Sequence, residues 1–444
     1  MRSIGLDIHR DFCEVAIAEG GRVRAAGRIG TAPAEIEAFA GGLRPDDSVT
    51  LEATGNALAI VRILEPHVRV VLANPKATKA ATRLRAKTDR IDARTLAQLL
   101  AGGFLPEVWV GGEATHALRR RVGRRVHLVR QRTKAKNQVH AVLLRNLAGR
   151  PPVSDVFGTR GRAWLERLVL PADERETLEA CLRTVDFLDA EVTALDRALA
   201  PLVLGSPDMR RLLTLPGVSA MTAATLIGVI GDIGRFPTPG QLVAYFGLDP
   251  RVRQSGNEPA RHGRISKQGA SEARHVLVEA AWVATRTAGP LRVFAHRLAA
   301  RRGWNIAIVA VARKLTVIVW HMLTHGEDYA FTRPILVRAK LREIELRSGA
   351  PRAKGRSIGV APTVAERQLE RELAAAAEVA YERLVKDWVP SRKQVREPQA
   401  GRASHDALRQ PARQGSAPTL HFGPANLPHH LDYASDPGPR QDGT

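Results

Sequence analysis

Four acidic residues could supply the ligands of a divalent-metal site, namely Asp7, Glu52, Asp89 and Asp92. Asp7 lies in an alternating run, residues 3–8, which predicts a β-strand with its apolar side chains on one face and Gly5 and Asp7 on the other. An acidic side chain beside buried strand residues needs a partner, usually a metal ion or a cation. Asp7 is therefore the first candidate ligand.

The other three acidic residues lie at the ends of further expected elements. Glu52 ends a short strand, residues 48–52, and the carboxyl ends of strands are where α/β sheets bind ligands. Asp89 and Asp92 are three residues apart in an expected helix, residues 88–100, and so share one face. Taken singly, Asp89 is equally explained as a helix cap and Asp92 as a surface charge.

As a set, the four carboxylates suit two hard cations, because oxygen ligands favour Mg²⁺. Two such ions about 3.5–4 Å apart activate the attacking oxygen and stabilise the leaving oxygen of a displacement. We therefore expect two Mg²⁺ ions at Asp7, Glu52, Asp89 and Asp92, and a raised pKa for at least one carboxyl when metal is absent.

The elements around these residues predict a mixed α/β fold at the N-terminus. Three expected strands are followed by alternating helices and strands, which is the element order of an RNase H-like sheet and also of an actin-like ATPase. The expected strands are residues 3–8, 11–18, 21–28, 48–52 and 68–73, and the expected helices are residues 33–40, 56–65 and 88–100, with Pro75 opening a further one.

The composition indicates a polyanionic partner. The chain has 444 residues, with 67 Lys and Arg against 45 Asp and Glu, a formal net charge of +22. Such a surface attracts nucleic acid through counterion release. The two cysteines have no metal-ligand spacing, and Arg313 and Lys314 interrupt the longest apolar stretch, residues 306–322. We expect a cytoplasmic protein without a membrane span.

One expected helix, residues 118–145, carries ten Arg or Lys residues and no acid. A uniformly basic helix repels itself, so a nucleic-acid backbone is the favoured partner, and a solvated helix is the alternative. With the helix expected at residues 173–202 it would form a long hairpin or coiled coil. The candidate contacts are Arg119, Arg120, Arg124, Arg125, Arg130, Arg132, Lys134 and Lys136.

Two segments of the second half also have candidate contacts. Residues 212–227 resemble a helix-hairpin-helix whose turn, at Gly217, could bind a phosphate, although Ser219 replaces the usual second glycine; a plain helical turn is the alternative. The Gly- and Arg-rich loop that follows has two serines, Ser255 and Ser266. Its candidate phosphate contacts are Arg253, Gly256, Arg264, Lys267 and Arg274.

Three runs resemble the DEDD transposases of the insertion-sequence "one-ten" family, relatives of the Piv invertase with a RuvC-like N-terminal domain. They are residues 5–9 (GLDIH), 51–55 (LEATG) and 87–93 (KTDRIDA). The resemblance implies that Asp7, Glu52, Asp89 and Asp92 are the catalytic tetrad and that Ser255, in the Ser-Gly motif, is the nucleophile. Ser266 is the competing candidate.

The resemblance also implies partners that the residues themselves do not show. These are DNA at the element's ends and at the target, a structured guide RNA encoded by the element, and a second copy of the chain in a dimer or tetramer. The expected location is the bacterial cytoplasm, associated with the nucleoid. We expect a transposase or site-specific recombinase that cuts and rejoins DNA.

Five segments are expected along the chain. They are an RNase H-like catalytic domain over residues 1–110, a basic helical hairpin or coiled coil over 111–203, a mostly α C-terminal transposase domain with a helix-hairpin-helix-like segment over 204–330, accessory helices over 331–389, and a disordered tail over 390–444, whose low content of apolar residues cannot offset its ordering entropy.

Three alternative functions are weaker. An actin-like sugar kinase or ATPase needs a second phosphate loop of the Asp-x-Gly-Gly type and an adenosine loop, and we find neither in the sequence. A stand-alone RuvC-like junction resolvase has no need of the segment at residues 204–330. A DNA-binding protein with an inactive site would not need to keep four carboxylates.

Overall fold

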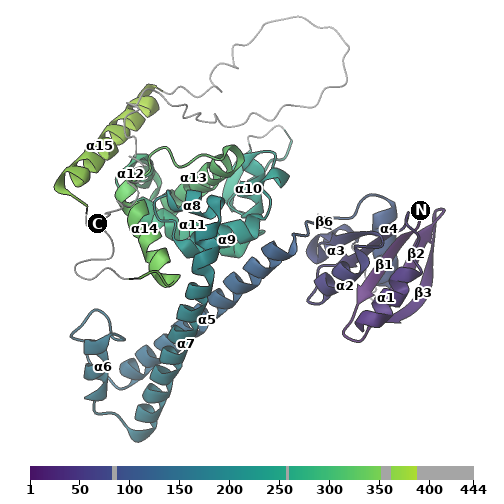
Figure 1. Ribbon diagram of the computed structural model, residues 1–444, viewed down its shortest axis with the longest axis horizontal. Coiled ribbons are helices and arrows are strands. Elements are labelled where there is room, and N and C mark those ends of the chain that lie inside the picture. Colours follow the sequence, from purple (N-terminus) through teal and green to yellow (C-terminus); the bar gives the residue numbers. More distant parts are fainter. Residues whose placement is uncertain (83–87, 257–259, 352–361, 388–444) are drawn as a thin grey trace, which may run out of the picture. The chain divides into compact units, whose positions relative to one another are not determined.

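The computed structural model describes residues 1–82, 88–256, 260–351 and 362–387 (Figure 1). The chain divides into two compact units, Met1–Ala114 and Thr115–Thr444. The first expected boundary, after residue 110, lies near this division, and the other expected boundaries fall within the second unit. Lys87 and the expected tail, residues 390–444, lie outside the described residues.

The first unit is built on a six-stranded mixed sheet with the strand order β3-β2-β1-β4-β5-β6. The central strand β1 pairs antiparallel with β2 and parallel with β4, β4 pairs parallel with β5, and β5 pairs antiparallel with β6. The strands are β1 (Ser3–Ile8), β2 (Phe12–Glu19), β3 (Arg22–Gly30), β4 (Ser48–Glu52), β5 (Arg69–Ala73) and β6 (Glu107–Val108).

Helices cover both faces of this sheet. One face of β1 is apolar, and the other face has Gly5 and Asp7. On the apolar face, Ile4 and Leu6 lie in one core with Ile36 and Leu64 of two covering helices. On the other face, α4 packs against β1 and β2. The helices of this unit are α1 (Pro33–Gly41), α2 (Ala57–Leu64), α3 (Pro75–Thr82) and α4 (Asp89–Ala101).

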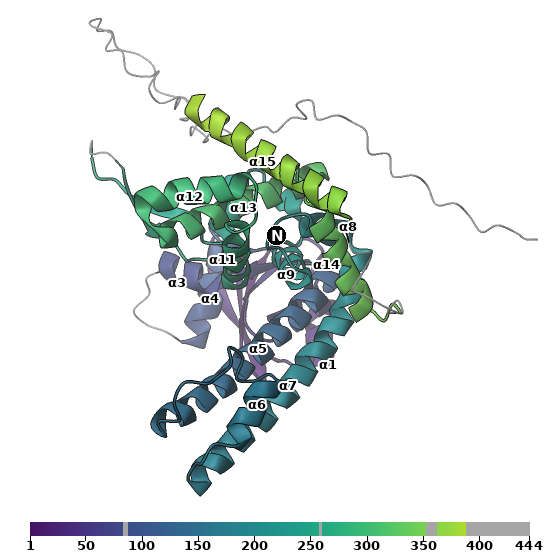
Figure 2. The ribbon, with the colours of Figure 1, turned by 90° about the vertical axis from the view of Figure 1, so that its left-hand side faces the viewer.

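The second unit begins with two long helices, α5 (Glu113–Arg145) and α7 (Ala172–Gly205), which the short α6 (Thr159–Glu166) separates in sequence. Figure 2 shows α5 and α7 side by side. Salt bridges join Arg125 to Asp196, Arg132 to Asp189, and Arg145 to Glu174. The partners' numbers fall as the arginines' numbers rise, so the two helices run antiparallel.

A helical core follows, with α13 packed against α10, α11 and α12. By length and composition α13 could cross a membrane, but Val311, Leu315 and Val319 are fully buried among the other helices, so we assign it as a core helix. The elements are α8 (Pro207–Leu213), α9 (Ala220–Ile230), η1 (Ile233–Arg235), α10 (Pro239–Tyr245), β7 (Pro250–Arg253), β8 (Arg261–Ile265), α11 (Ser271–Ala284), α12 (Pro290–Arg302) and α13 (Trp304–His325).

Two further helices, α14 (Pro334–Arg347) and α15 (Val364–Asp387), complete the second unit. Glu370 of α15 accepts hydrogen bonds from Arg333 and from the Ile335 amide, and so caps the start of α14. Lys340 of α14 donates to the carbonyls of Leu213 and Leu215 at 2.7 and 2.8 Å.

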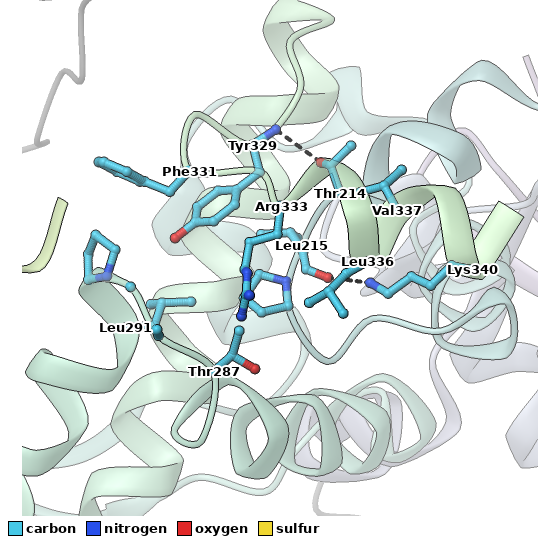
Figure 3. Close-up of a pocket in the computed structure, with 14 residues that line it drawn as sticks. Thr214, Leu215, Thr287, Leu291, Tyr329, Phe331, Arg333, Leu336, Val337 and Lys340 are labelled. Atoms are coloured by element: carbon cyan, nitrogen blue, oxygen red, sulfur yellow. Dashed lines mark hydrogen bonds between the residues drawn. The ribbon is translucent and has the colours of Figure 1, made fainter. Parts of the chain in front are cut away.

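Lys340 and Arg333 line a small pocket beside the turn after α8 (Figure 3). Burial lowers the pKa of Lys340 to about 8. The amine is occupied by two backbone carbonyls, and Arg333 is held by Glu370. The polar groups of this pocket therefore fasten α14 to the core rather than face a ligand.

Candidate active site

The end of β1 brings together three potential metal ligands. Nε2 of His9 lies 3.2 Å from a carboxylate oxygen of Asp7 and 3.3 Å from one of Asp89. One ligand atom from each of the three residues lies within 4.8 Å of the others. All three residues are half-buried. This donor set of carboxylate oxygens and an imidazole nitrogen fits a divalent cation.

The electrostatics of Asp7 support the same reading. Burial raises the pKa of its carboxyl, the nearby charges of Asp92 and Asp89 raise it further, and His9 opposes them. The sequence predicted such a shift from repulsion between acids, whereas burial is the larger cause. A bound cation would favour the ionised form of Asp7, because it neutralises carboxylates that otherwise repel one another.

Glu52 ends β4, the parallel neighbour of β1. The register pairs Gly5 with Thr50 and Leu6 with Leu51 and stops one step before Asp7 and Glu52. The close group of ligand atoms holds Asp7, His9 and Asp89, and neither Glu52 nor Asp92 belongs to it. Asp92 is one turn beyond Asp89 on α4, and its charge reaches Asp7.

His9 is a candidate ligand that the sequence reasoning missed. It follows Asp7 by two residues, and in an extended chain this spacing puts both side chains on one face, which was a usable signal. The ring stacks on Phe12 with centroids 4.7 Å apart, and Asn56 donates to the His9 carbonyl at 3.1 Å. These contacts orient the imidazole toward the two aspartates.

The first turn of α4 is held against the sheet by a buried glutamate. Glu14 of β2 lies opposite Asp7 in the antiparallel register and is 2% exposed. Its carboxylate accepts from Arg28 at 2.7 Å and from Arg90 of α4 at 3.2 Å. Thr88 caps the helix by accepting from the Ile91 amide. Arg90 and Thr88 therefore position the turn that carries Asp89 and Asp92.

Close packing at Gly5 brings α4 near enough for its acids to reach Asp7. A Cβ atom on Gly5 would lie 2.2 Å from the Ala93 carbonyl oxygen and 2.6 Å from the Ala97 amide nitrogen. Both are backbone atoms, so the helix as a whole would have to move. Gly5 is thus required by the distance between β1 and α4.

We expect Gly5→Ala to lower the free energy of unfolding by about 3 kcal/mol, because overpacking against backbone costs this order of energy. It should also separate Asp89 from Asp7 and abolish metal-dependent activity. Denaturant titration measures the first effect. The matched control is Gly41→Ala in α1, where a new Cβ meets nothing within 4 Å and stability should be unchanged or slightly higher. Equal stability of the two variants would contradict this explanation of Gly5.

The serine segment of the second unit is a β-hairpin rather than the open loop expected from the sequence. Strands β7 and β8 pair antiparallel, with Arg253 opposite Arg261. Ser255 and Gly256 follow β7 and are exposed, and Gly256 has a φ of +54°, a conformation that favours glycine. Residues 257–259, between the strands, lie outside the described residues. The Ser255 side chain is thus accessible to solvent just after the end of β7.

Ser266 lies at the other end of the hairpin and is half-buried. Its hydroxyl donates to Asp249 at 2.6 Å and accepts from the Gln268 amide at 3.4 Å. The Ser266 amide also donates to the Asp249 carbonyl at 2.8 Å. These bonds close the base of the hairpin. Because the Asp249 carboxylate could also accept the Ser266 proton, Ser266 remains the alternative nucleophile to Ser255.

Comparison with known proteins finds two family models that match separate segments of the chain. A family model of DEDD transposases of the IS110 type matches residues 4–146, and the model described as "Transposase IS116/IS110/IS902 family" matches residues 209–295. The protein y4qE of Sinorhizobium fredii, named as a transposase, is 31% identical over 292 residues, which cover 63% of this chain and 70% of that protein. The chain belongs to the IS110 family of transposases.

Two further relatives agree with this assignment. The transposase for insertion sequence element IS1111A of Coxiella burnetii is 28% identical, over 74% of this chain and 91% of the relative. The pilin gene-inverting protein of Moraxella lacunata is 28% identical, over 31% of this chain and 45% of the relative. The chain is a DNA transposase or recombinase, as the sequence predicted, and neither a stand-alone resolvase nor a sugar kinase.

The basic helix of this transposase differs in part from the prediction. Arg119 donates to the carbonyls of Gly228 and Val229 at the end of α9, and burial lowers its pKa. Arg124 pairs with Glu191 at 2.7 Å, and Arg125 and Arg132 pair with acids of α7. The sequence predicted that these two helices form a hairpin, but not which arginines of α5 meet acids of α7, because that depends on the register between the helices.

The remaining predicted nucleic-acid contacts of α5 do not pair with acids of α7 in the contacts described above. Arg130 and Lys134 are exposed, as is Arg120. The Lys136 amine lies 4.6 Å from the centre of the Phe157 ring. Fewer basic side chains of α5 are therefore available to bind nucleic acid than the eight that the sequence predicted.

Two other predicted nucleic-acid contacts have packing roles. A Cβ on Gly217, whose φ is +79°, would lie 2.2 Å from the Ala280 carbonyl oxygen, so packing against α11 explains this glycine without a phosphate. Arg274 donates to the Phe246 carbonyl at 2.9 Å and supports the turn after α10. Arg253, Arg264 and Lys267 are exposed on the hairpin and remain candidate contacts.

This division of the basic residues gives a direct prediction. Replacing Arg130 and Lys134 together by alanine should weaken DNA binding and reduce the slope of log K against log salt by about 0.9 for each phosphate that is no longer neutralised. The control is Arg125→Ala, which should leave the slope unchanged and cost about 1–3 kcal/mol of stability, since Asp196 is deprived of its hydrogen-bonded partner. An unchanged slope in the double variant would show that the exposed side of α5 does not bind DNA.

Proposed function

We propose that this transposase cuts and rejoins DNA with Mg²⁺ bound by Asp7, Glu52, Asp89 and Asp92, and with Ser255 as the nucleophile. The observation that carries the proposal is the convergence of Asp7, His9 and Asp89 to within 4.8 Å at the end of β1. The strand order, with β4 parallel to β1 on the side away from β2, supports an RNase H-like, RuvC-like domain around this site.

The carboxylates bind and orient the metal, and His9 completes or positions the same cluster. When bound, two Mg²⁺ ions withdraw charge from the scissile phosphate and stabilise the leaving oxygen. Asp7 must be ionised to serve as a ligand, and burial raises its pKa, so protons compete with the metal for this carboxylate. Metal affinity should accordingly rise with pH through the titration of Asp7.

The serine would form the covalent intermediate. Its hydroxyl oxygen bonds to phosphorus, its proton leaves to a base, and the bond from phosphorus to one strand's oxygen breaks. The resulting phosphoserine conserves the bond energy, so attack by another strand's hydroxyl restores the serine and joins DNA. Arg253, Arg264 and Lys267 are exposed on the same hairpin, and their positive charges would stabilise the phosphate charge.

Further partners follow from the family resemblance alone. We propose a structured guide RNA on the basic surface of the second unit, assembly as a dimer or tetramer, and action on nucleoid DNA in the cytoplasm. The net charge of +22 is consistent with extended nucleic-acid contacts.

The test is strand cleavage of a nicked suicide DNA substrate that carries the element's end, with Mg²⁺ or with EDTA. We expect a covalent protein–DNA adduct with Mg²⁺ and none with EDTA. Equal cleavage in EDTA would exclude the metal-dependent reaction.

A further inference from the structure

Three aromatic side chains from three helices gather on the surface of the second unit. They are Trp282 of α11, His296 of α12 and Trp304, the first residue of α13. The two indole rings are stacked, with centroids 6.4 Å apart and 24° between their planes, and His296 meets Trp304 edge-on at 5.1 Å. Trp282 is 36% exposed and Trp304 is 42% exposed.

Exposed tryptophans are unusual, because indole rings contribute most to stability when they are buried. Trp320 of α13, for comparison, is half-buried and donates its ring N–H to the Phe236 carbonyl at 2.7 Å. The exposed pair lies on rigid elements, since Ala281, Ala295 and Ala307 of the same three helices are fully buried. Figure 2 shows these helices packed together.

The segment that carries the pair is basic in sequence. Between Glu279 and Glu327 the chain has six Arg and one Lys, and no acidic residue. Arg301 and Arg302 are exposed and precede Gly303, whose φ of +81° turns the chain from α12 into α13. Arg301 and Arg302 thus end α12 three and two residues before Trp304. Arg286, just after α11, and Arg297 of α12 are exposed as well.

This combination has a specific ligand chemistry. Every nucleobase has a flat face that stacks on an aromatic ring, while its phosphates need cations. In a duplex the base faces are covered by neighbouring pairs, so an aromatic surface stacks only on unpaired bases. Apolar Ile306 and Val283, about half exposed on α13 and α11, extend the surface that a base could cover.

We propose that Trp282 and Trp304 form a stacking platform for unpaired bases of a DNA strand, with Arg301 and Arg302 binding its backbone. The proposal rests on the function proposed above, because cutting and exchange of strands leave bases without their partners. We propose DNA as the ligand, since membership of a transposase family implies DNA binding.

The experiment measures fluorescence anisotropy of labelled single strands, in EDTA so that no cleavage occurs. The probes are a twelve-residue thymidine strand, an abasic DNA strand of the same length and charge, and a twelve-residue uridine RNA. Trp304→Ala should bind the thymidine strand about tenfold more weakly or worse. It should bind the abasic strand as the wild type does, and Trp304→Phe should retain part of the affinity.

Three further variants separate stacking from other effects. Phe187→Ala removes a more exposed aromatic residue, 64% exposed on acidic α7, and should change nothing. Replacing Arg301 and Arg302 by alanine should reduce the salt slope by about 0.7 for each phosphate that is no longer neutralised, whereas Trp304→Ala should leave the slope unchanged. Trp282→Ala gives a second test of stacking if circular dichroism shows Trp304→Ala to be unfolded.

The proposal is overturned if folded tryptophan variants bind the thymidine strand like the wild type, or lose affinity for the abasic strand equally. It is also overturned if the tryptophan effect appears only with RNA. Asp89→Asn, which should not cut, should bind the thymidine strand normally, so failure of catalysis and failure of the platform are separate results.

Discussion

Replacing Asp89 by asparagine is expected to abolish strand cleavage while leaving DNA binding nearly intact. The substitution keeps the size of the side chain but removes the charge that lies 3.3 Å from His9 and raises the pKa of Asp7. A metal held by fewer carboxylates cannot stabilise the transition state as well, so we expect a loss of cleavage of about 10²–10³-fold or more. A gel assay of nicking beside a binding assay measures both quantities.

The control for Asp89→Asn must be an acid of the same unit that lies away from the site. Asp46 is suitable, because it is exposed and paired with the N-terminal amine at 2.9 Å. Asp46→Asn should cleave as the wild type does. If Asp89→Asn cleaves normally, or if it loses DNA binding as severely as cleavage, Asp89 is not a metal ligand in the sense proposed.

Replacing Ser255 by alanine is expected to remove the covalent protein–DNA adduct completely, because no other atom of that side chain can form the phosphoester. Ser255 is exposed after β7, whereas the Ser266 hydroxyl is engaged by Asp249 at 2.6 Å. Ser266→Ala should therefore keep the adduct, although loss of the hairpin's closing bonds will reduce its yield. Adducts are trapped on a nicked suicide substrate and separated by denaturing electrophoresis.

The reverse pattern would change the assignment. An adduct that survives Ser255→Ala and disappears in Ser266→Ala would make Ser266 the nucleophile and Asp249 its base, since that carboxylate is already within hydrogen-bond distance. Asp249→Asn then decides between a base and a structural partner, because a structural role survives the exchange of carboxylate for amide. Under our proposal this variant still forms the adduct.

Much of the first unit could be predicted from the sequence because its signals are local. Alternation located β1, and the run after Thr88 located α4 to within a residue. Strand β6, only Glu107–Val108, escaped prediction because a two-residue strand is defined by its partner β5 rather than by its own pattern. The contact between Glu14 and Arg90, 76 positions apart, likewise depends on packing.

The basic residues show where sequence reasoning stops. Charge alone could not separate Arg125, which pairs with Asp196, from exposed Arg130, because the acids of α7 come into reach only after the chain folds back. For the same reason Gly217 was interpreted as a phosphate contact, whereas its close approach to Ala280 is visible only in the packed core. Local sequence patterns were enough to predict the helices and strands. Which basic side chains are free of acidic partners on neighbouring helices depends on tertiary contacts.

Metal-dependent stabilisation of the purified protein tests the central claim most directly, because it reports metal binding without DNA or catalysis. Thermal unfolding is followed while Mg²⁺ or Mn²⁺ is added to the wild type and to Asp7→Asn. We expect the wild type to gain about 2.7 kcal/mol at a metal concentration a hundred times its Kd, and the variant to gain little. Equal stabilisation of the two proteins would show that the metal binds elsewhere and would contradict the site at Asp7.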